Sequence, residues 1–174
     1  MLFWVHAAVA YLVYRVIVRS VSEEQPAGGD VIPLTGGALF PDLVDKPLAF
    51  IVSSLPSRSM AHSLFVTVGL LAVVGALASR REQRGVAGVF ALGYLSHLGT
   101  DLVDSVFIPE ETLSFLFWPV VTEYHHIDTV GDLLALLSPT PYVLAQTVVT
   151  LVAIALWIGD GKPGYSSTTN SQNT

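Results

Sequence analysis

Long apolar stretches separated by short polar segments dominate the chain. Four of these stretches, residues 2–18, 63–78, 85–108 and 142–158, have the apolarity of membrane-spanning helices, which need about 20 predominantly apolar residues to cross the hydrocarbon core. Two weaker segments, 31–55 and 113–121, are too broken or too short to cross plainly and are expected to be tilted, re-entrant or interfacial. The pattern predicts an all-α fold, a polytopic membrane helix bundle with about four to five transmembrane helices.

The domain organisation follows from the same pattern. Residues 1–159 are predicted to form a single integral membrane domain. Residues 160–174 are rich in glycine, serine, threonine and asparagine, which predicts a disordered polar tail. The first apolar stretch lacks a basic segment before it, so we expect it to be retained as a helix and not removed as a signal peptide.

The basic residues predict the orientation. Arg80, Arg81 and Arg84 crowd the loop 79–84 between the second and third predicted spans. Short loops rich in arginine and lysine stay in the cytoplasm. We therefore expect a multi-pass protein of the cell membrane with this loop and the C-terminal tail on the cytoplasmic side.

Composition narrows the class further. Apolar residues make up 52% of the chain, charged residues 13%, and the mean hydropathy is +0.60, which excludes a disordered chain, a collagen-like repeat and a disulfide scaffold. The absence of cysteine excludes a thiolate metal site and a cysteine nucleophile. A net charge of −6 without a basic patch argues against nucleic acid as a partner. The expected partner is the lipid bilayer, and the sequence leaves the oligomeric state open.

Ionisable residues inside the predicted spans point to function, because each costs about 2.5–3.5 kcal/mol at the centre of a membrane helix. Tyr94, His97, Asp101 and Asp104 follow one another at steps of three, four and three, so they share one helical face. A buried pair such as His97 and Asp101 is costly without a partner. The third long span is therefore expected to face a polar site.

Further polar residues are expected to reach the same depth. Asp42 and Asp45 are three residues apart in LFPDLVDK, Arg58 and His62 are four apart in SRSMAHS, and His6 lies about one turn into the first span. Under the predicted topology His6 and His62 enter from the outer side. His97 lies about 18 Å along its helix from residue 85, which also places it in the outer half of the bilayer.

Imidazoles and carboxylates together predict a divalent metal site. A mixed nitrogen and oxygen set suits zinc first, with manganese, iron or cobalt as alternatives, better than an all-oxygen cage. The candidate ligands are His6, Asp42, Asp45, His62, His97 and Asp101. Each residue also has a simpler interpretation: His6 can bond a neighbouring helix, Asp42 or Asp45 can cap a helix or pair with Lys46 or Arg58, Asp104 can be solvated, and Arg58 can anchor at the interface.

Four blocks resemble, in order, a known family. LFPDLVDK, SRSMAHSLF, GYLSHLGTDLVDS and FWPV are similar to the PDxDH, HRGxTHS, GYxSHxxxD and WP motifs of the YdjM-like membrane-bound metal-dependent hydrolases, also described as LexA-binding, inner-membrane-associated hydrolases. The resemblance covers about two-thirds of the chain. The family pattern also has an early histidine in its first helix, which matches His6. Residue by residue, the four motifs match positions Asp42, Asp45, Arg58, His62, Ser63, His97, Asp101, Trp118 and Pro119.

The chain departs from the family pattern at three positions. Lys46 and Ser57 stand where the family motifs have histidine, and Ala61 replaces the threonine before the matched histidine. The site is then either reduced or completed from elsewhere. His125 and His126, in EYHHID, are candidates to compensate, although the pattern favours a solvated loop for them.

The resemblance implies a metal-dependent hydrolase. In that interpretation Asp45 or Asp104 acts as a general base or orients a ligand imidazole, and Arg58 holds an anionic group of an amphiphilic or phosphoester substrate. Two other classes stay open: a small transporter or proton or metal-ion pathway, and a non-catalytic membrane scaffold held together by its polar cluster. No Gly-rich phosphate loop, GxSxG or HExxH motif is present to decide among them.

Overall fold

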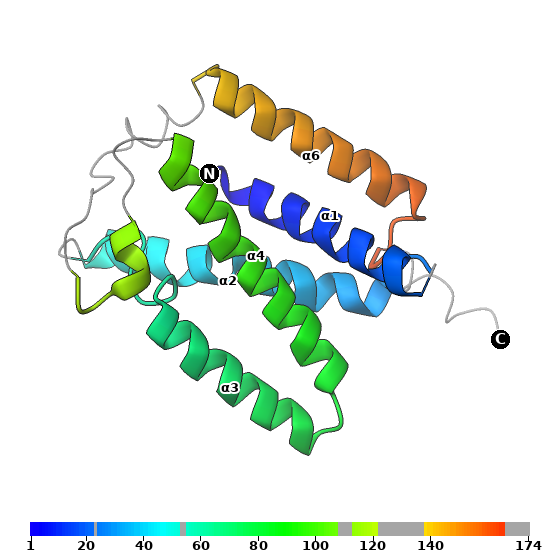
Figure 1. Ribbon diagram of the computed structural model, residues 1–174, viewed down its shortest axis with the longest axis horizontal. Coiled ribbons are helices and arrows are strands. Elements are labelled where there is room, and N and C mark those ends of the chain that lie inside the picture. The colour runs from blue at the N-terminus through cyan, green and yellow to red at the C-terminus, as the bar shows by residue number, and fades with distance from the viewer. Residues whose placement is uncertain (23, 53–54, 108–112, 122–137, 166–174) are drawn as a thin grey trace.

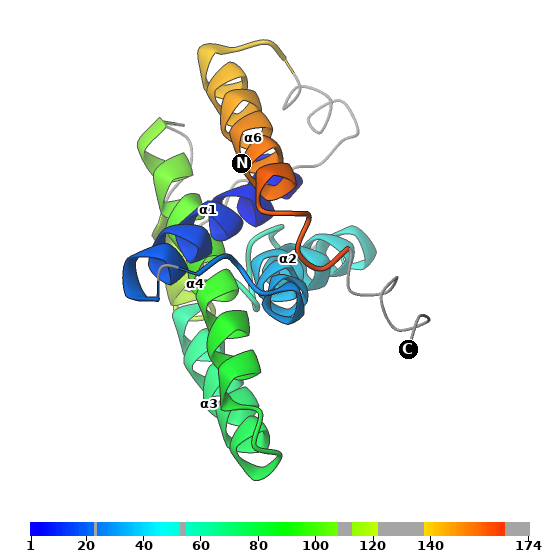
Figure 2. The ribbon, with the colours of Figure 1, turned by 90° about the vertical axis from the view of Figure 1, so that its right-hand side faces the viewer.

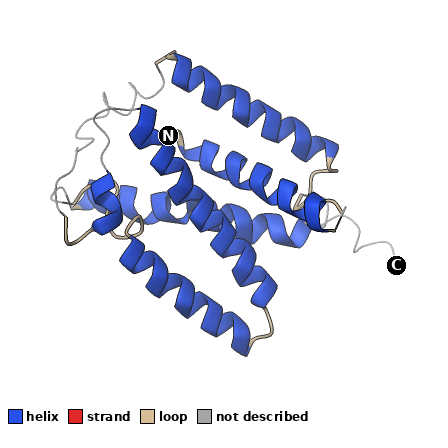
Figure 3. Cartoon of the chain, in the orientation of Figure 1, coloured by secondary structure: helices blue, strands red, loops and turns tan. Residues whose placement is uncertain are grey.

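The computed structural model describes residues 1–22, 24–52, 55–107, 113–121 and 138–165 (Figure 1). In chain order its elements are α1 (Phe3–Val21), α2 (Gly28–Ile51), α3 (Leu64–Arg80), α4 (Arg84–Phe107), the 3-10 helix η1 (Leu113–Phe117) and α6 (Pro141–Gly159). Every regular element within these residues is helical (Figure 3). The predicted all-α class is confirmed.

Helix lengths agree with a membrane bundle. Three helices, α1, α4 and α6, are long and apolar enough to cross a membrane, and α3 is a shorter apolar helix of 17 residues. These four helices correspond to the four apolar stretches of the sequence. The polar faces of α1 and α4 do not prevent this assignment, because those faces point into the bundle.

The segment 31–55, which the sequence left undecided, is mostly one helix. α2 continues for 24 residues through Pro33, Pro41 and Pro47. An internal proline removes a backbone hydrogen bond and usually ends or kinks a helix, so packing against a neighbour has to compensate. That neighbour is α4, which crosses α2 and makes with it the most extensive helix–helix contact (Figure 1). Of the other undecided segment, 113–121, the first five residues form η1.

Two glycines allow α2 and α4 to touch through their backbones. A Cβ atom added at Gly37 would lie 2.1 Å from the carbonyl oxygen of Phe90, and one added at Gly93 would lie 2.1 Å from that of Leu34. No side chain fits at either position. This close approach brings the residues that follow Gly93 on α4 directly beside α2.

The helices α1, α2 and α4 form the centre of the molecule, with α3 and α6 on opposite sides of it (Figures 1 and 2). A small apolar core of Ala10, Tyr14, Leu34 and Ala38 joins α1 to α2. On the two sides of this centre, α3 packs against α4 and α6 packs against α1. The polar site described below therefore lies among the three central helices.

The outside of the bundle is apolar and much of its inside is polar. Large apolar side chains such as Val68 and Leu77 of α3 and Leu144 and Leu151 of α6 are exposed. Buried side chains include histidines and aspartates of α1, α2 and α4. This distribution is the reverse of that in a water-soluble protein and is typical of a bundle solvated by lipid.

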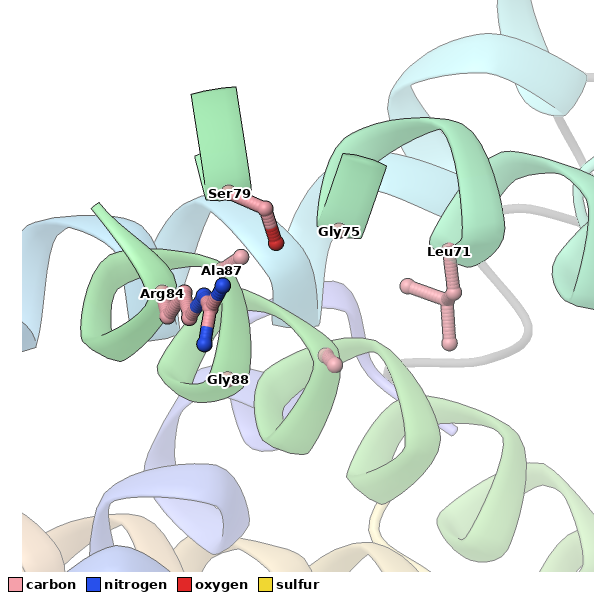
Figure 4. Close-up of a pocket in the computed structure, with 7 residues that line it drawn as sticks. Leu71, Gly75, Ser79, Arg84, Ala87 and Gly88 are labelled. Atoms are coloured by element: carbon pink, nitrogen blue, oxygen red, sulfur yellow. The ribbon is translucent and has the colours of Figure 1, made fainter. Parts of the chain in front are cut away.

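A crevice of about 270 Å³ separates α3 from α4 near the turn that joins them (Figure 4). Gly75 and Gly88 line it, and a Cβ atom added at either position would meet nothing within 4 Å. Ser79 and Arg84 stand at its end near the turn (Figure 4). The glycines of this crevice therefore differ from Gly37 and Gly93, which are in tight contact.

The C-terminal end of α6 is fixed to α1 by a buried carboxylate. Asp160 accepts hydrogen bonds from the Tyr11 hydroxyl at 2.7 Å, from Arg15 Nε at 2.6 Å and from Arg19 Nη2 at 2.8 Å. Residues 160–165, the first part of the expected tail, follow as a turn that contacts the start of α2. The remaining expected tail, 166–174, lies outside the described residues.

Candidate metal centre

Residues from four parts of the chain meet at the end of the bundle where α1 begins and α4 ends. α1 contributes His6, α2 contributes Asp42, the turn before α3 contributes His62, and α4 contributes His97 and Asp101. All five side chains are buried. The structure thus brings together three imidazoles and two carboxylates that are up to 95 positions apart in the sequence.

Each imidazole has its Nδ1 atom on a hydrogen-bond acceptor. His97 Nδ1 lies 2.7 Å from the carbonyl oxygen of Ala38, and His62 Nδ1 lies 2.7 Å from Asp45 Oδ2. His6 Nδ1 lies 2.6 Å from Thr100 Oγ1, whose own hydrogen is donated to the carbonyl oxygen of His97. Because all three partners accept, each neutral imidazole carries its hydrogen on Nδ1 and keeps a lone pair on Nε2.

The free ring nitrogens converge. His62 Nε2 and His97 Nε2 are 3.1 Å apart, and Asp101 Oδ2 lies 3.3 Å from the first and 3.4 Å from the second. Asp101 Oδ2 is buried and has no hydrogen-bond partner among the described residues. Two nitrogen lone pairs and a carboxylate oxygen at this separation repel one another unless a cation lies between them.

The remaining two donors surround the same point. Asp42 Oδ1 lies 3.6 Å from His62 Nε2 and 3.9 Å from His97 Nε2. His6 Nε2 lies 3.7 Å from Asp101 Oδ1 and 3.9 Å from Asp42 Oδ2, with its ring stacked on that of His97 at 3.9 Å. Two overlapping sets of donors therefore exist, His6–Asp42–His97 and His62–His97–Asp101, each with its donor atoms within 4.8 Å of one another. This nitrogen and oxygen set fits a transition metal such as zinc.

Asp45 stands behind His62 and does not belong to either donor set. Its carboxylate accepts hydrogen bonds from the backbone N–H groups of Ser59, Ala61 and His62 at 2.8 to 3.2 Å, and from His62 Nδ1. Both carboxylate oxygens are thus used within the protein. Of the roles predicted for Asp45, this geometry matches the orientation of an imidazole.

Arg58 and Asp104 lie on the other side of Asp101. Arg58 Nη2 donates to Asp101 Oδ1 at 3.1 Å and to Asp104 Oδ2 at 2.6 Å, and its guanidinium group lies 5.7 Å from the Phe115 ring centroid. Asp104 also accepts from the Tyr142 hydroxyl at the start of α6. Asp104 is therefore buried and paired, so the simpler interpretation of a solvated carboxylate is wrong.

Lys46 donates to Asp42 Oδ2 at 2.7 Å, one helical turn away. The ammonium group engages one carboxylate oxygen and leaves Oδ1 toward the imidazoles. Ser57, the other departure from the family motif, is half-buried in the turn before α3. His125 and His126 lie outside the described residues.

A family model described as YdjM inner membrane protein matches residues 1–159. The chain belongs to this family. The match spans every described element from α1 to α6, and with them all five convergent donors. The description of the family as an inner membrane protein agrees with the apolar exterior of the bundle. Neither the curated proteins nor the solved structures provide a match to the chain.

Sequence reasoning did not assign their supporting contacts to several residues around these donors. Thr100, which holds His6, lies on the same face of α4 as His97, so its spacing was an available signal. Tyr94, predicted for this face, donates its hydroxyl hydrogen to the carbonyl oxygen of Ala61 and so holds the turn that carries His62. No pattern in the sequence links Tyr142 to the site, because only the fold brings the start of α6 beside Asp104.

Proposed function

We propose that this member of the YdjM family is a membrane-bound metal-dependent hydrolase. The observation that supports this most directly is the arrangement of three imidazoles whose Nδ1 atoms are all bonded and whose Nε2 atoms face two carboxylates. Metal-ligating histidines characteristically donate their second nitrogen to a carbonyl, hydroxyl or carboxylate in this way. His62 Nε2 and His97 Nε2 are 3.1 Å apart and repel each other unless a metal ion or a proton lies between them.

The proposed ligands are His62, His97 and Asp101, with His6 and Asp42 completing the same centre. Zinc is the first expectation, with manganese, iron and cobalt as alternatives. A divalent ion held there supplies Lewis-acid chemistry, which polarises the bond to be cleaved and makes water nucleophilic at neutral pH. Several carboxylates in a small buried volume also agree with a cation, since uncompensated charges are costly to bury.

The remaining residues have roles that follow from their contacts. Asp45, Thr100 and the Ala38 carbonyl orient the three imidazoles. Arg58 balances the charge of Asp101 and Asp104 and has 16% of its side chain exposed, so it is placed to meet an anionic group at the edge of the centre. Asp104, whose Oδ2 atom lies 2.6 Å from Arg58 Nη2 beside the centre, is the proposed proton acceptor.

The proposed substrate is amphiphilic. The centre lies at the end of the bundle opposite Arg80 and Arg84, which belong to the arginine-rich loop. With that loop in the cytoplasm, as the positive-inside rule predicts, the centre lies in the outer half of the bilayer. A substrate that reaches this depth has an apolar part in lipid and its reacting bond near the interface.

The decisive experiment is metal analysis of the detergent-purified protein and of two variants, His97→Ala and Asp42→Ala. We expect a stoichiometric metal in the wild type and its loss in both variants. Asp30→Asn is the matched control, because this carboxylate is on the same helix as Asp42 but bonds Tyr14 away from the centre. If the wild type stays free of metal after reconstitution with each ion, the hydrolase is overturned. A proton held between His62 and His97 would then support the pathway alternative.

A further inference from the structure

A second feature of the bundle lies on the other face of α1. A groove of about 630 Å³ runs between α1, α2 and α6, and apolar side chains form nearly all of its walls. This volume is in the range of small-molecule sites. Trp4 and Tyr11 line it from α1, Leu43 from α2, and Ile154 and Trp157 from α6. In a bilayer, a groove of this chemistry accepts hydrocarbon and excludes water.

Small residues hollow out the groove. Gly36 lines it from α2, and a Cβ atom added there would meet nothing within 4 Å. The next residue, Gly37, is in tight contact with α4, where an added Cβ atom would lie 2.1 Å from the Phe90 carbonyl oxygen. Gly36 is thus not needed for helix packing, and its missing side chain leaves room in the groove.

The turn after α6 borders one end of the groove. Pro163, Gly164 and Tyr165 line this end. Trp157 Nε1 donates to the Pro163 carbonyl oxygen at 3.0 Å, and a Cβ atom added at Gly28 would lie 3.0 Å from Gly164 N. The turn therefore reaches from α6 to the start of α2.

The other end of the groove leads toward the candidate metal centre. Leu39, Leu43 and Lys46 follow at steps of four and three along α2, so Lys46 continues the wall of the groove by one turn. Its ammonium group is 2.7 Å from Asp42 Oδ2 and 6.0 Å from the Phe3 ring centroid, and 41% of the side chain is exposed. A partly exposed cation thus lies one turn beyond the groove, beside the buried donor Asp42.

We propose that the groove holds the acyl chain of the substrate and that the substrate is a lipid with an anionic headgroup, which Lys46 contacts. That the bound lipid is a substrate rests on the proposed hydrolase function. The binding of the lipid in the groove can be tested independently of that function. The chain lies along α1 with its end at residues 163–165, and the headgroup lies at Lys46 beside Asp42. The turn at 163–165 sets an upper limit on the length of the bound chain.

Tryptophan fluorescence reports the binding directly, because two of the three tryptophans of the chain, Trp4 and Trp157, line the groove. The probes are brominated lysophosphatidic acid and brominated lysophosphatidylcholine, titrated into the detergent-purified protein. We expect saturable quenching with the anionic probe. Simple partition into the micelle gives quenching that does not saturate and does not distinguish the two headgroups, and this result would overturn the proposal.

Three variants and one control variant locate the site. Gly36→Leu fills the groove and is expected to remove the saturable quenching, and Ala8→Leu does the same from α1 if the first variant fails to fold. Gly75→Leu is the matched control, because an added Cβ atom also meets open space there, but on α3. Lys46→Gln is expected to weaken binding of the anionic probe by about fivefold, as one basic residue near the membrane surface does. Undiminished saturable quenching in both groove-filling variants would exclude the groove.

Chain length gives an independent result. With brominated probes of increasing acyl length, affinity is expected to rise and then fall once the chain reaches the turn at 163–165. An affinity that rises without limit would contradict a groove that ends at this turn. The two proposals fail separately: loss of metal in His97→Ala leaves the quenching unchanged, and loss of quenching in Gly36→Leu leaves the metal content unchanged.

Discussion

At the scale of single residues, the candidate centre depends on groups that do not face it. Asp45 uses both carboxylate oxygens to hold the turn 59–62 and the ring of His62. Ala38 and Thr100 do the same for His97 and His6 with one hydrogen bond each. Asp45 therefore combines the most contacts and is the most informative of the three to change.

We expect Asp45→Asn to lower metal affinity by about 10- to 100-fold, because the amide nitrogen cannot accept from the backbone donors and His62 loses its fixed orientation. Competition with a chelator measures the affinity. Asp30→Asn, which replaces a carboxylate on the same helix, serves as the reference and should leave the affinity unchanged. Equal affinities in the wild type and Asp45→Asn would show that the carboxylate does not position His62.

Asp160 gives a prediction about pH. Burial raises its pKa, but hydrogen bonds from Arg15, Tyr11 and Arg19 outweigh this and hold the pKa below its usual value of 3.8. A carboxylate with a lowered pKa stabilises the folded state above its unfolded pKa and loses that contribution as the pH falls through the folded value. We expect Asp160→Asn to destabilise the protein by about 1–3 kcal/mol at pH 7.

The pH dependence of stability separates the contribution of the Asp160 charge from that of its packing. As the pH falls below about 4, the difference in unfolding temperature between the wild type and Asp160→Asn should shrink, because the wild-type carboxyl becomes protonated as well. Thermal unfolding of both proteins in detergent across this range measures it. A difference that stays constant would mean that Asp160 contributes through packing and not through its charge.

At the scale of elements, the pairing of α2 with α4 fixes the site. Gly37 and Gly93 leave no room for a side chain, and His97 follows Gly93 by one turn on α4. Separation of the two helices by even one methyl group moves His97 away from the Ala38 carbonyl oxygen. Packing and metal binding therefore depend on the same contact.

We expect Gly37→Ala and Gly93→Ala each to destabilise the protein by about 1–3 kcal/mol through overpacking and to reduce metal content as well. Gly88→Ala provides the comparison, since its added methyl group meets open space and alanine favours the helix. Unfolding in a mixed detergent series gives the stabilities. If all three substitutions have the same effect, the close contact of α2 and α4 is not what stabilises the bundle.

Most of the helices, and the polar face of α4, could be predicted from the sequence. The apolar stretches predicted α1, α3, α4 and α6, and the steps of three and four from Tyr94 to Asp104 predicted a shared face, whose residues are all buried. His97 and Asp101 of this face lie together with the other candidate donors in the fold. The metal itself, and the catalytic roles, stay predictions.

The helix α2 and the roles of two site residues could not be predicted from the sequence, for physical reasons. The three prolines and four ionisable residues of α2 lower its helical and membrane signals, and only contact with α4 makes the helix continuous. The roles of Asp45 and Tyr142 depend on partners distant in sequence, in the turn 59–62 and at Asp104. Spacing along one helix carries no information about such pairs.

At the scale of the whole molecule, the polar centre joins the elements of a bundle that has little apolar core. His6, Asp42, His62 and His97 come from α1, α2, the turn before α3 and α4. In lipid, apolar contacts between helices give little driving force for association. A cation shared by these donors would hold the four parts together.

We therefore expect removal of the metal by a chelator to lower the unfolding temperature, by the equivalent of about 2.7 kcal/mol when free metal had been at 100 times its dissociation constant. Thermal unfolding with and without the chelator measures the effect, and readdition of metal should restore it. Asp101→Ala should be insensitive to the chelator. A chelator effect of equal size in this variant would place the metal elsewhere.

The neighbouring glycines of α2 separate two kinds of constraint. Position 37 is limited to glycine by the backbone of α4, whatever lipid the protein meets, whereas position 36 faces only the groove. The fold therefore requires glycine at position 37, whereas the residue at position 36 can change with the acyl-chain length of the lipids in the host membrane. A change from glycine to a larger residue at position 36 would shorten the accepted chain in one mutational step, without passing through an unstable intermediate protein.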